Sequence, residues 1–310
     1  MNFDGVTFSG GISVVWTPPS NKAIFGYGTN NASDLSITNL VSNTGVVATD
    51  TAGVGTGRHD LAAAGYGTDK AIFGYGLATG YLSVTNLVSN TGVVGNDVTG
   101  VGTARAFLAA ATYGTDKAIF GYGSNGSGKL SMTNLVSNAG VVATDTAGVG
   151  TARNGLAAAT YGTDKAIFGY GVIAGPVQQS VTNKVSNTGV VATDTTGVGT
   201  ARSGLAAAGY GSDKAIFGYG STGSVTAITN LVSNTGVVAT DTTGVGTARA
   251  YLAGAGYGTD TAIFGYGSTD GGTTLVSTTN LVSNTGVVAT NTTGVGTIRY
   301  SLAAASYGLS

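Results

Sequence analysis

The sequence predicts an all-β protein that is built from six similar units. A phenylalanine marks the same point of each unit, at spacings of 48, 47, 48, 49 and 47 residues: Phe25, Phe73, Phe120, Phe168, Phe217 and Phe264. The segments around these positions are rich in Val, Ile, Phe and Thr and show no helical periodicity. Self-similarity at this period is typical of units that each bury one face against the next unit.

Each unit contains four short predicted strands, which are clearest in the second copy. These strands are residues 61–64, 70–74, 83–88 and 92–96. The first and second strands are joined by residues 66–69, and the third and fourth by residues 89–92. Both connections consist of Gly, Asn, Asp, Ser and Thr with one Tyr, a composition that suits tight reversals of the chain.

The strand count predicts how the six units close into a ring. The first unit begins at its second strand, residues 22–26, and the chain ends with a lone copy of the first strand, residues 302–305. If these two segments pair, both termini complete one blade, and a six-bladed β-propeller closes without an exposed edge. The Ala-rich first strands suit the narrow axis of such a ring. Residues 12–16 compete for the same position, and a seventh, partial blade is an alternative.

The predicted domains are an N-terminal arm, residues 1–20, and the propeller, residues 21–310, with a period of about 47–50 residues. The arm holds Trp16, the sole tryptophan, and a predicted strand that ends at Pro18 and Pro19. It is expected either to cap the first unit or to dock on a larger assembly.

The charge balance excludes two classes of partner. Glu is absent, 14 Asp nearly cancel 13 Lys plus Arg, and the net charge is −1, so neither nucleic acid nor an anionic membrane is expected to bind. A surface of Gly, Thr, Ser and Asn without cysteine is more typical of a secreted or virion protein. Residues 1–20 show no signal peptide, and no apolar run approaches the roughly 18 residues of a membrane span. We therefore expect a virion or extracellular location.

The unit resembles a Kelch repeat. The matching residues in the second unit are Arg58, residues 61–64, Ile72 and Phe73, Gly74 and Gly76, residues 86–88 and residues 89–92. The resemblance covers residues 22–306 and implies a propeller of four-stranded blades. Two features depart from the family pattern: Tyr75 interrupts the double glycine, and Val94 stands where the family has Trp. Near-identical repeats in a Gly/Thr/Asn-rich chain also resemble receptor-binding or fibre proteins of tailed bacteriophages.

The residue inventory argues against an enzyme. His59 is the sole histidine, and with Asp60 beside it could act as a general base or be an ordinary loop residue. No Ser/His/Asp arrangement, metal-ligand spacing or nucleotide loop is evident, so neither a cofactor nor a metal is expected. Asp side chains recur at one point of the repeat, where turn capping is expected and calcium binding is the alternative. They are Asp50, Asp97, Asp145, Asp194 and Asp241, with Asn291 in the sixth copy.

One arginine stands at the same point of every unit. The six are Arg58, Arg105, Arg153, Arg202, Arg249 and Arg299. Repetition in every unit favours a structural role, with hydrogen bonds to backbone carbonyls or Asp. A cationic ring around the axial channel is the alternative.

The copies differ in two places, which predict the binding site. The insert after each Gly-Tyr-Gly varies between 8 and 11 residues, and the two residues after each repeat arginine differ in every copy. Because the strands are antiparallel, both sets are expected on one face of the disc. A constant scaffold with one diversified face is the usual division between framework and binding loops. Aromatic rings flanked by neutral polar groups suit sugar recognition, although neutral drift of exposed loops is the alternative. The predicted ligand-binding residues are His59, Asp60, Phe107, Asn154, Tyr251 and Tyr300.

We therefore expect a non-enzymatic binding module, a phage tail-fibre or other virion surface protein that contacts a host-surface glycan or receptor. Other virion proteins would be partners, with residues 1–20 as the docking arm, and a homo-oligomer is compatible with this interpretation. The alternatives are a purely structural virion or filament component whose face is a subunit contact, and a polysaccharide lyase or hydrolase.

Overall fold

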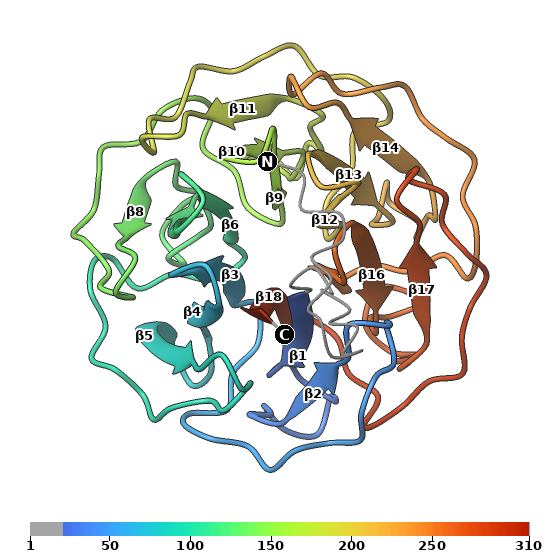
Figure 1. Cartoon of the computed structure of the whole chain (residues 1–310). Coiled ribbons are helices and arrows are strands. Elements are labelled where there is room, and N and C mark those ends of the chain that lie inside the picture. The colour runs from blue at the N-terminus through green and yellow to red at the C-terminus, as the bar shows by residue number, and fades with distance from the viewer. Residues whose placement is uncertain (1–20, 310) are drawn as a thin grey trace, which may run out of the picture.

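The computed structural model describes residues 21–309, and these residues form eighteen β-strands in six three-stranded sheets. The sheets stand around a central axis in chain order, in a propeller-like arrangement (Figure 1). This confirms the all-β class and the six units. The predicted arm, residues 1–20, lies outside the described residues. Between residues 21 and 309, no helix is long and apolar enough to cross a membrane.

The second unit shows the arrangement that the others repeat. Strand β3 (Ala62–Tyr66) lies near the axis, β4 (Lys70–Leu77) is in the middle and β5 (Tyr81–Val88) is outside, in antiparallel order (Figure 1). The following sheets are β6 (Ala109–Tyr113), β7 (Lys117–Gly121) and β8 (Thr133–Val136); β9 (Ala157–Tyr161), β10 (Lys165–Gly169) and β11 (Thr182–Val185); β12 (Ala206–Tyr210), β13 (Lys214–Gly218) and β14 (Thr229–Val232); and β15 (Ala253–Tyr257), β16 (Thr261–Gly265) and β17 (Thr279–Val282).

The two ends of the described chain meet in one sheet. Strand β18 (Ala303–Leu309) pairs with β1 (Asn21–Gly26), which pairs with β2 (Thr38–Val41). Within this ladder Ala305 lies opposite Ile24, and Ala304 lies opposite Phe25. This is the pairing that the strand count predicted, and it places a complete inner strand at every unit.

The predicted fourth strand, residues 92–96, is not a regular strand. It is replaced by two isolated bridges, Val88 to Val94 and Thr85 to Val98, so each sheet has three strands rather than the expected four. The two bridges are three residues apart on β5, from Thr85 to Val88, but four residues apart on this segment, from Val94 to Val98. The segment therefore contains one extra residue, which bulges out and interrupts the ladder. The buried Asn86 side chain donates a 3.0 Å hydrogen bond to the Gly95 carbonyl and thus supplies a partner at the interruption.

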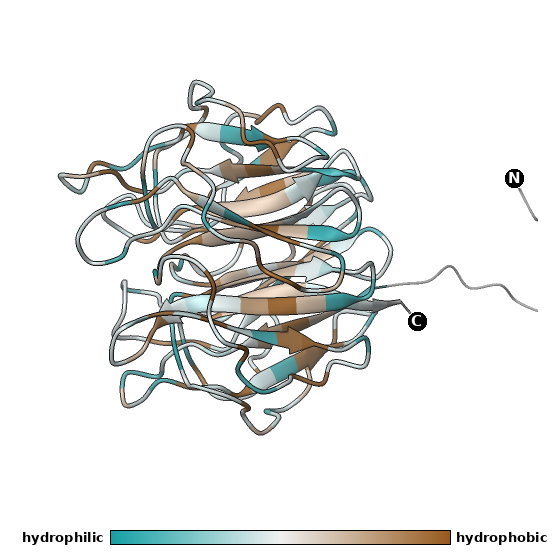
Figure 2. Cartoon of the chain, turned by 90° about the vertical axis from the view of Figure 1, so that its left-hand side faces the viewer, coloured by the Kyte–Doolittle hydropathy of each residue, from teal (hydrophilic) through white to brown (hydrophobic). Residues whose placement is uncertain are grey.

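The core lies between neighbouring sheets. Ile72 and Tyr75 of the second sheet pack with Leu108 and Phe120 of the third, and the Tyr75 and Phe120 rings are 5.2 Å apart. Each fully buried aliphatic or aromatic side chain of this kind contributes about 1.5–3 kcal/mol. Viewed from the side, apolar residues occupy the middle of the strands, which run between the two faces of the disc (Figure 2). The sheets therefore hold each other through flat apolar contacts, and both faces are free to carry loops.

Replacing Gly169 by alanine should destabilise the protein by about 1–3 kcal/mol, because overpacking forces side chains out of place. Gly169 ends β10, and a Cβ there would lie 2.7 Å from the Phe217 ring of the next sheet. The matched control is Gly128→Ala in an open loop, where a Cβ meets no atom within 4 Å. Chemical denaturation followed by circular dichroism measures both, and equal midpoints for the two variants would contradict tight packing at Gly169.

Candidate functional site

The two variable sets of residues lie on one face of the disc. His59 and Leu77 exchange two backbone hydrogen bonds, of 2.9 and 2.8 Å, which join the segment before β3 to the end of β4, where the variable insert begins. Equivalent bridges join the two segments in the other units: Ala106 to Ser124, Asn154 to Val172, Ser203 to Ser221, Ala250 to Ser268 and Tyr300 to Thr29. This face is called the variable face below, and the opposite face, formed by the nearly invariant turns, is called the constant face.

A closed ring of backbone hydrogen bonds surrounds the axis at the variable face. In each unit, the second residue after the repeat arginine donates its N–H to the carbonyl of the equivalent residue in the previous unit, over 2.7–2.9 Å. The six ring residues are Asp60, Phe107, Gly155, Gly204, Tyr251 and Ser301. They line a shallow cavity of about 70 Å³ together with the leucine that follows each of them. Those six leucines are each 5 % exposed, so the floor of this cavity is apolar and well packed.

Four of the ring residues hold a side chain in a left-handed backbone conformation. Their φ angles are 53° at Asp60, 57° at Phe107, 57° at Tyr251 and 54° at Ser301, whereas glycine occupies the other two positions. The left-handed conformation costs an ordinary residue about 1–2 kcal/mol. Glycine would adopt it without that cost, so these four units retain side chains that the ring geometry does not favour.

The structure separates the six predicted site residues into two circles. Asp60, Phe107 and Tyr251 line the central cavity, while His59, Asn154 and Tyr300 stand one residue earlier and pair with the neighbouring loops. Four of them come together where the chain closes, namely His59, Asp60, Tyr251 and Tyr300. The two tyrosine rings meet edge to face with centroids 6.0 Å apart.

His59 lies between two carboxylates. Its Nδ1 is 2.6 Å from Oδ1 of Asp34, and its Nε2 is 3.5 Å from Oδ2 of Asp60. The carboxylates face opposite nitrogens of the imidazole and do not converge on one point. Accordingly, among residues 21–309 no group of three His, Cys, Asp or Glu side chains is placed to hold a metal ion.

Burial raises the pKa of Asp60, Tyr251 and Tyr300. It raises the pKa of Asp60 to about 6, against the opposing effects of a hydrogen bond from Ser301 and the His59 charge. Burial also raises the pKa of Tyr251 and Tyr300, and the Asp60 charge raises both further. The Asp34 charge also raises the pKa of Asp60 and of Tyr300. Both carboxylates therefore lie within electrostatic reach of the Tyr300 hydroxyl.

Asp34 was not predicted from the sequence. It lies in the variable insert of the first unit, 25 residues before His59, and nothing local links the two. The one available signal was that Asp34 and Asp270 are the only acidic residues in the six inserts after Gly-Tyr-Gly.

Asn154 and Phe107 lie at other units of the variable face. Asn154 pairs with Val172, and its Oδ1 is buried without a hydrogen-bond partner in the described part of the chain. Phe107 contributes to the central ring on the side of the third unit.

The repeat arginines are buried between the sheets and do not line the channel. Arg58 donates 2.8 Å to the Tyr75 carbonyl and 2.7 Å to Asn86 Oδ1, and its guanidinium stacks 4.3 Å from the Tyr27 ring. All six arginines are 0 % exposed, make the same contact with a buried Asn and stack on a Tyr of the previous unit. No cationic ring therefore reaches the axial channel from these positions.

The recurring Asp side chains link units to each other. Oδ2 of Asp97 accepts hydrogen bonds from the Thr56 amide at 3.0 Å and from the Thr56 hydroxyl at 2.6 Å, and Oδ1 accepts from Asn86 at 2.9 Å. Thr56 precedes the second sheet, whereas Asp97 follows it. The carboxylate thus joins the segment before the second sheet to the segment after it. This role differs from the expected capping of a local turn.

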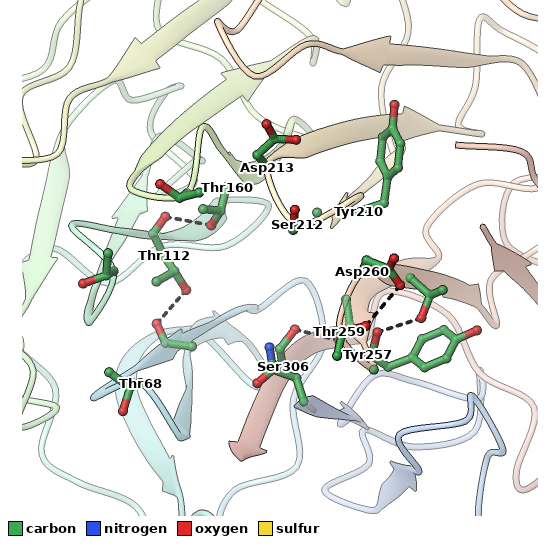
Figure 3. A pocket seen from close by; sticks show the side chains of 18 of the residues that line it. Thr68, Thr112, Thr160, Tyr210, Ser212, Asp213, Tyr257, Thr259, Asp260 and Ser306 are labelled. Atoms are coloured by element: carbon green, nitrogen blue, oxygen red, sulfur yellow. Dashed lines mark hydrogen bonds between the residues drawn. The ribbon is translucent and has the colours of Figure 1, made fainter. Parts of the chain in front are cut away.

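A second cavity opens on the constant face, at the other end of the axis. It measures about 250 Å³ and is lined by hydroxyl groups, among them Thr68, Thr112, Thr160 and Ser306 (Figure 3). Several of these hydroxyls already donate to the adjacent unit: Thr112 donates 2.8 Å to the Gly65 carbonyl, and Ser306 donates 2.7 Å to the Gly256 carbonyl. A second closed ring of six backbone hydrogen bonds, of 2.6–2.7 Å, surrounds this mouth, and one of them joins Gly67 to Asp116.

The comparisons with known proteins assign no family to the chain. No protein-family model matches it, and no curated protein matches it.

Proposed function

We propose that the protein is a non-enzymatic binding module of a tail fibre or virion surface, and that its variable face recognises a host-surface glycan. The observation that carries this proposal is the strain at the central ring. Asp60, Phe107 and Tyr251 keep side chains at left-handed φ angles, although glycine serves the same position in two other units. Side chains that cost stability are typical of sites where contacts with a ligand matter.

The chemistry of the face supports a sugar as the ligand. Tyr251 and Tyr300 form a half-buried aromatic pair beside the polar groups of Asp34, His59 and Asp60. The apolar faces of sugar rings stack on aromatic side chains, while their hydroxyls need hydrogen-bond donors and acceptors. Both needs are met within one cluster.

We further propose that the units are divergent Kelch-like blades. The tyrosine that interrupts the double glycine adopts a left-handed φ in all six units, for example 64° at Tyr75, and so takes the conformation that a glycine would. The bulged segment after β5 would then be an irregular fourth strand. The arm, residues 1–20, would attach the module to other virion proteins.

A Tyr251→Ala/Tyr300→Ala double variant should lose at least about tenfold in glycan affinity, because it removes two stacking surfaces, each worth on the order of 1 kcal/mol. A glycan-array screen of the intact protein identifies the glycan, and titration of that glycan compares the variants. The matched control is Asp116→Ala/Lys117→Ala on the constant face, which should bind like the unaltered protein.

Two outcomes would count against the proposal. Binding that survives in the tyrosine variant would place recognition elsewhere, and absence of binding to every glycan would remove the proposed ligand class. Equal loss in the two double variants would indicate a general effect on folding instead of a site.

A structural role for the constant face is the second candidate. Six valines at equivalent positions next to its turns are 61–66 % exposed: Val46, Val93, Val141, Val190, Val237 and Val287. Repeated exposure of an apolar side chain in every unit favours a contact with another subunit. Self-association of the intact protein without any glycan binding would favour this candidate.

A further inference from the structure

The cluster at the closing point of the ring carries negative charge beside two aromatic rings. It contains the carboxyl groups of Asp34 and Asp60 and one imidazole, that of His59, which lies within 3.5 Å of both. Two acidic groups thus stand against one imidazole in this cluster. A ligand on this face therefore meets an acidic site.

Within residues 21–309, no Lys or Arg side chain is recorded as acting on this cluster's buried carboxyl. The charged groups that shift the pKa of Asp60 are His59 and Asp34, and no Lys or Arg of the described chain is among them. Arg58 is next in sequence, but its guanidinium is fully buried against Tyr27 and donates to Tyr75 and Asn86. Lys129 stands on the loop of the third unit and donates to the Ile173 carbonyl.

The tyrosines and the carboxylates together form the surroundings that an organic cation prefers. Tyr251 and Tyr300 meet edge to face, at an interplanar angle of 69°. The face of an aromatic ring attracts a cation by about 0.5–2 kcal/mol. Asp34 is the more accessible carboxylate, with 27 % of its side chain exposed, whereas Asp60 is 9 % exposed and acts from behind.

We infer that the ligand of the variable face is a sugar that bears an ammonium group, held by the Tyr251 and Tyr300 rings and the Asp34 carboxylate. This inference rests on the proposed glycan-binding function and specifies its ligand class. An acidic sugar would be repelled by the cluster, and a neutral sugar would leave its charge uncompensated. Asp60 is a positioning residue, since its largely buried carboxyl lies 3.5 Å from Nε2 of His59 and adds charge behind Asp34.

The test uses three probes that differ in one group: methyl 6-amino-6-deoxyglucoside, its N-acetyl derivative and methyl glucoside. NMR titration of the full chain at pH 7.5 should show about tenfold tighter binding of the amine than of the other two. A primary alkyl ammonium, like that of lysine, stays protonated from pH 5 to pH 8, so the probe keeps its charge.

The preference for the amine over the uncharged probes should depend on pH, because a carboxyl group of the protein titrates while the amine keeps its charge. Asp60 has a raised pKa of about 6, so it is charged above that pH and becomes neutral as the pH falls below it. The preference for the amine should therefore shrink several-fold between pH 7.5 and pH 5. Binding of methyl glucoside, which carries no charge, should change little over the same range.

Two variants and a control separate charge from folding. Asp34→Asn and Asp60→Asn should each reduce the preference for the amine, and both keep a side chain of similar size. Asp116→Asn on the constant face should leave the preference unchanged. Equal affinity for the three probes would overturn the inference while leaving the proposed function intact, whereas binding of no probe and of no array glycan would overturn both.

Discussion

Replacing Arg153 by methionine should destabilise the protein by about 2–6 kcal/mol, because each of two buried acceptors left without its donor costs about 1–3 kcal/mol. Arg153 is 0 % exposed, donates to the Tyr170 carbonyl at 2.8 Å and to Asn183 Oδ1 at 2.6 Å, and stacks 4.4 Å from the Tyr122 ring. Methionine fills much of the volume but donates nothing, so both acceptors would remain buried without a partner. Chemical denaturation followed by circular dichroism measures the loss.

The control for this prediction is Asp194→Asn. The sixth unit already has Asn291 at this position, where its Oδ1 accepts from Thr247 and its Nδ2 donates 2.7 Å to the Thr247 hydroxyl. The amide can thus make the contacts of the carboxylate, and we expect a loss below about 1 kcal/mol. An Arg153→Met variant that is as stable as Asp194→Asn would show that the arginine network contributes little.

Removing residues 302–310 should abolish the cooperative unfolding transition. The deletion takes away β18, which forms the inner strand of the first sheet and contacts the sheets on both sides. It leaves β1 as an unpaired edge and breaks the constant-face ring at the Gly308 amide, which donates to Asp69. In a ring of small units, stability comes largely from contacts between neighbours, so the loss reaches beyond one sheet.

A synthetic peptide of residues 299–310 provides the control. Added in excess, it should restore the circular dichroism spectrum and the elution volume of the unaltered protein, since the strand can pair with β1 without a covalent link. A deletion variant that unfolds at the original midpoint without the peptide would contradict the role of β18 in closing the ring.

Much of the fold was predictable because the repeat is nearly exact. Six phenylalanines at a regular spacing gave the number of units, and the lone strand at residues 302–305 gave its partner at residues 22–26. The prediction of a regular fourth strand was wrong for a physical reason. Its composition suits a strand, but the extra residue between Val94 and Val98 breaks the ladder, and a bulge has no clear signature in single-sequence patterns.

The candidate site was predictable only in part. Variation between copies pointed to His59, Asp60, Tyr251 and Tyr300, which lie close together at the closing point of the ring. Asp34 joins them through a contact that depends on how two loops of different length fold over each other. The central hydrogen-bond ring could not be predicted from the sequence either, because it is formed by backbone amide and carbonyl groups that every unit has.

That central ring has a consequence for how the protein can change over generations. Its six bonds use only amide and carbonyl groups, so the side chain at each ring position is not needed for closure. A substitution there alters one sector of the surface while the other five keep their geometry. Side chains at the six positions can therefore change one sector at a time, each at the cost of its left-handed backbone, while the backbone bonds that close the ring are kept.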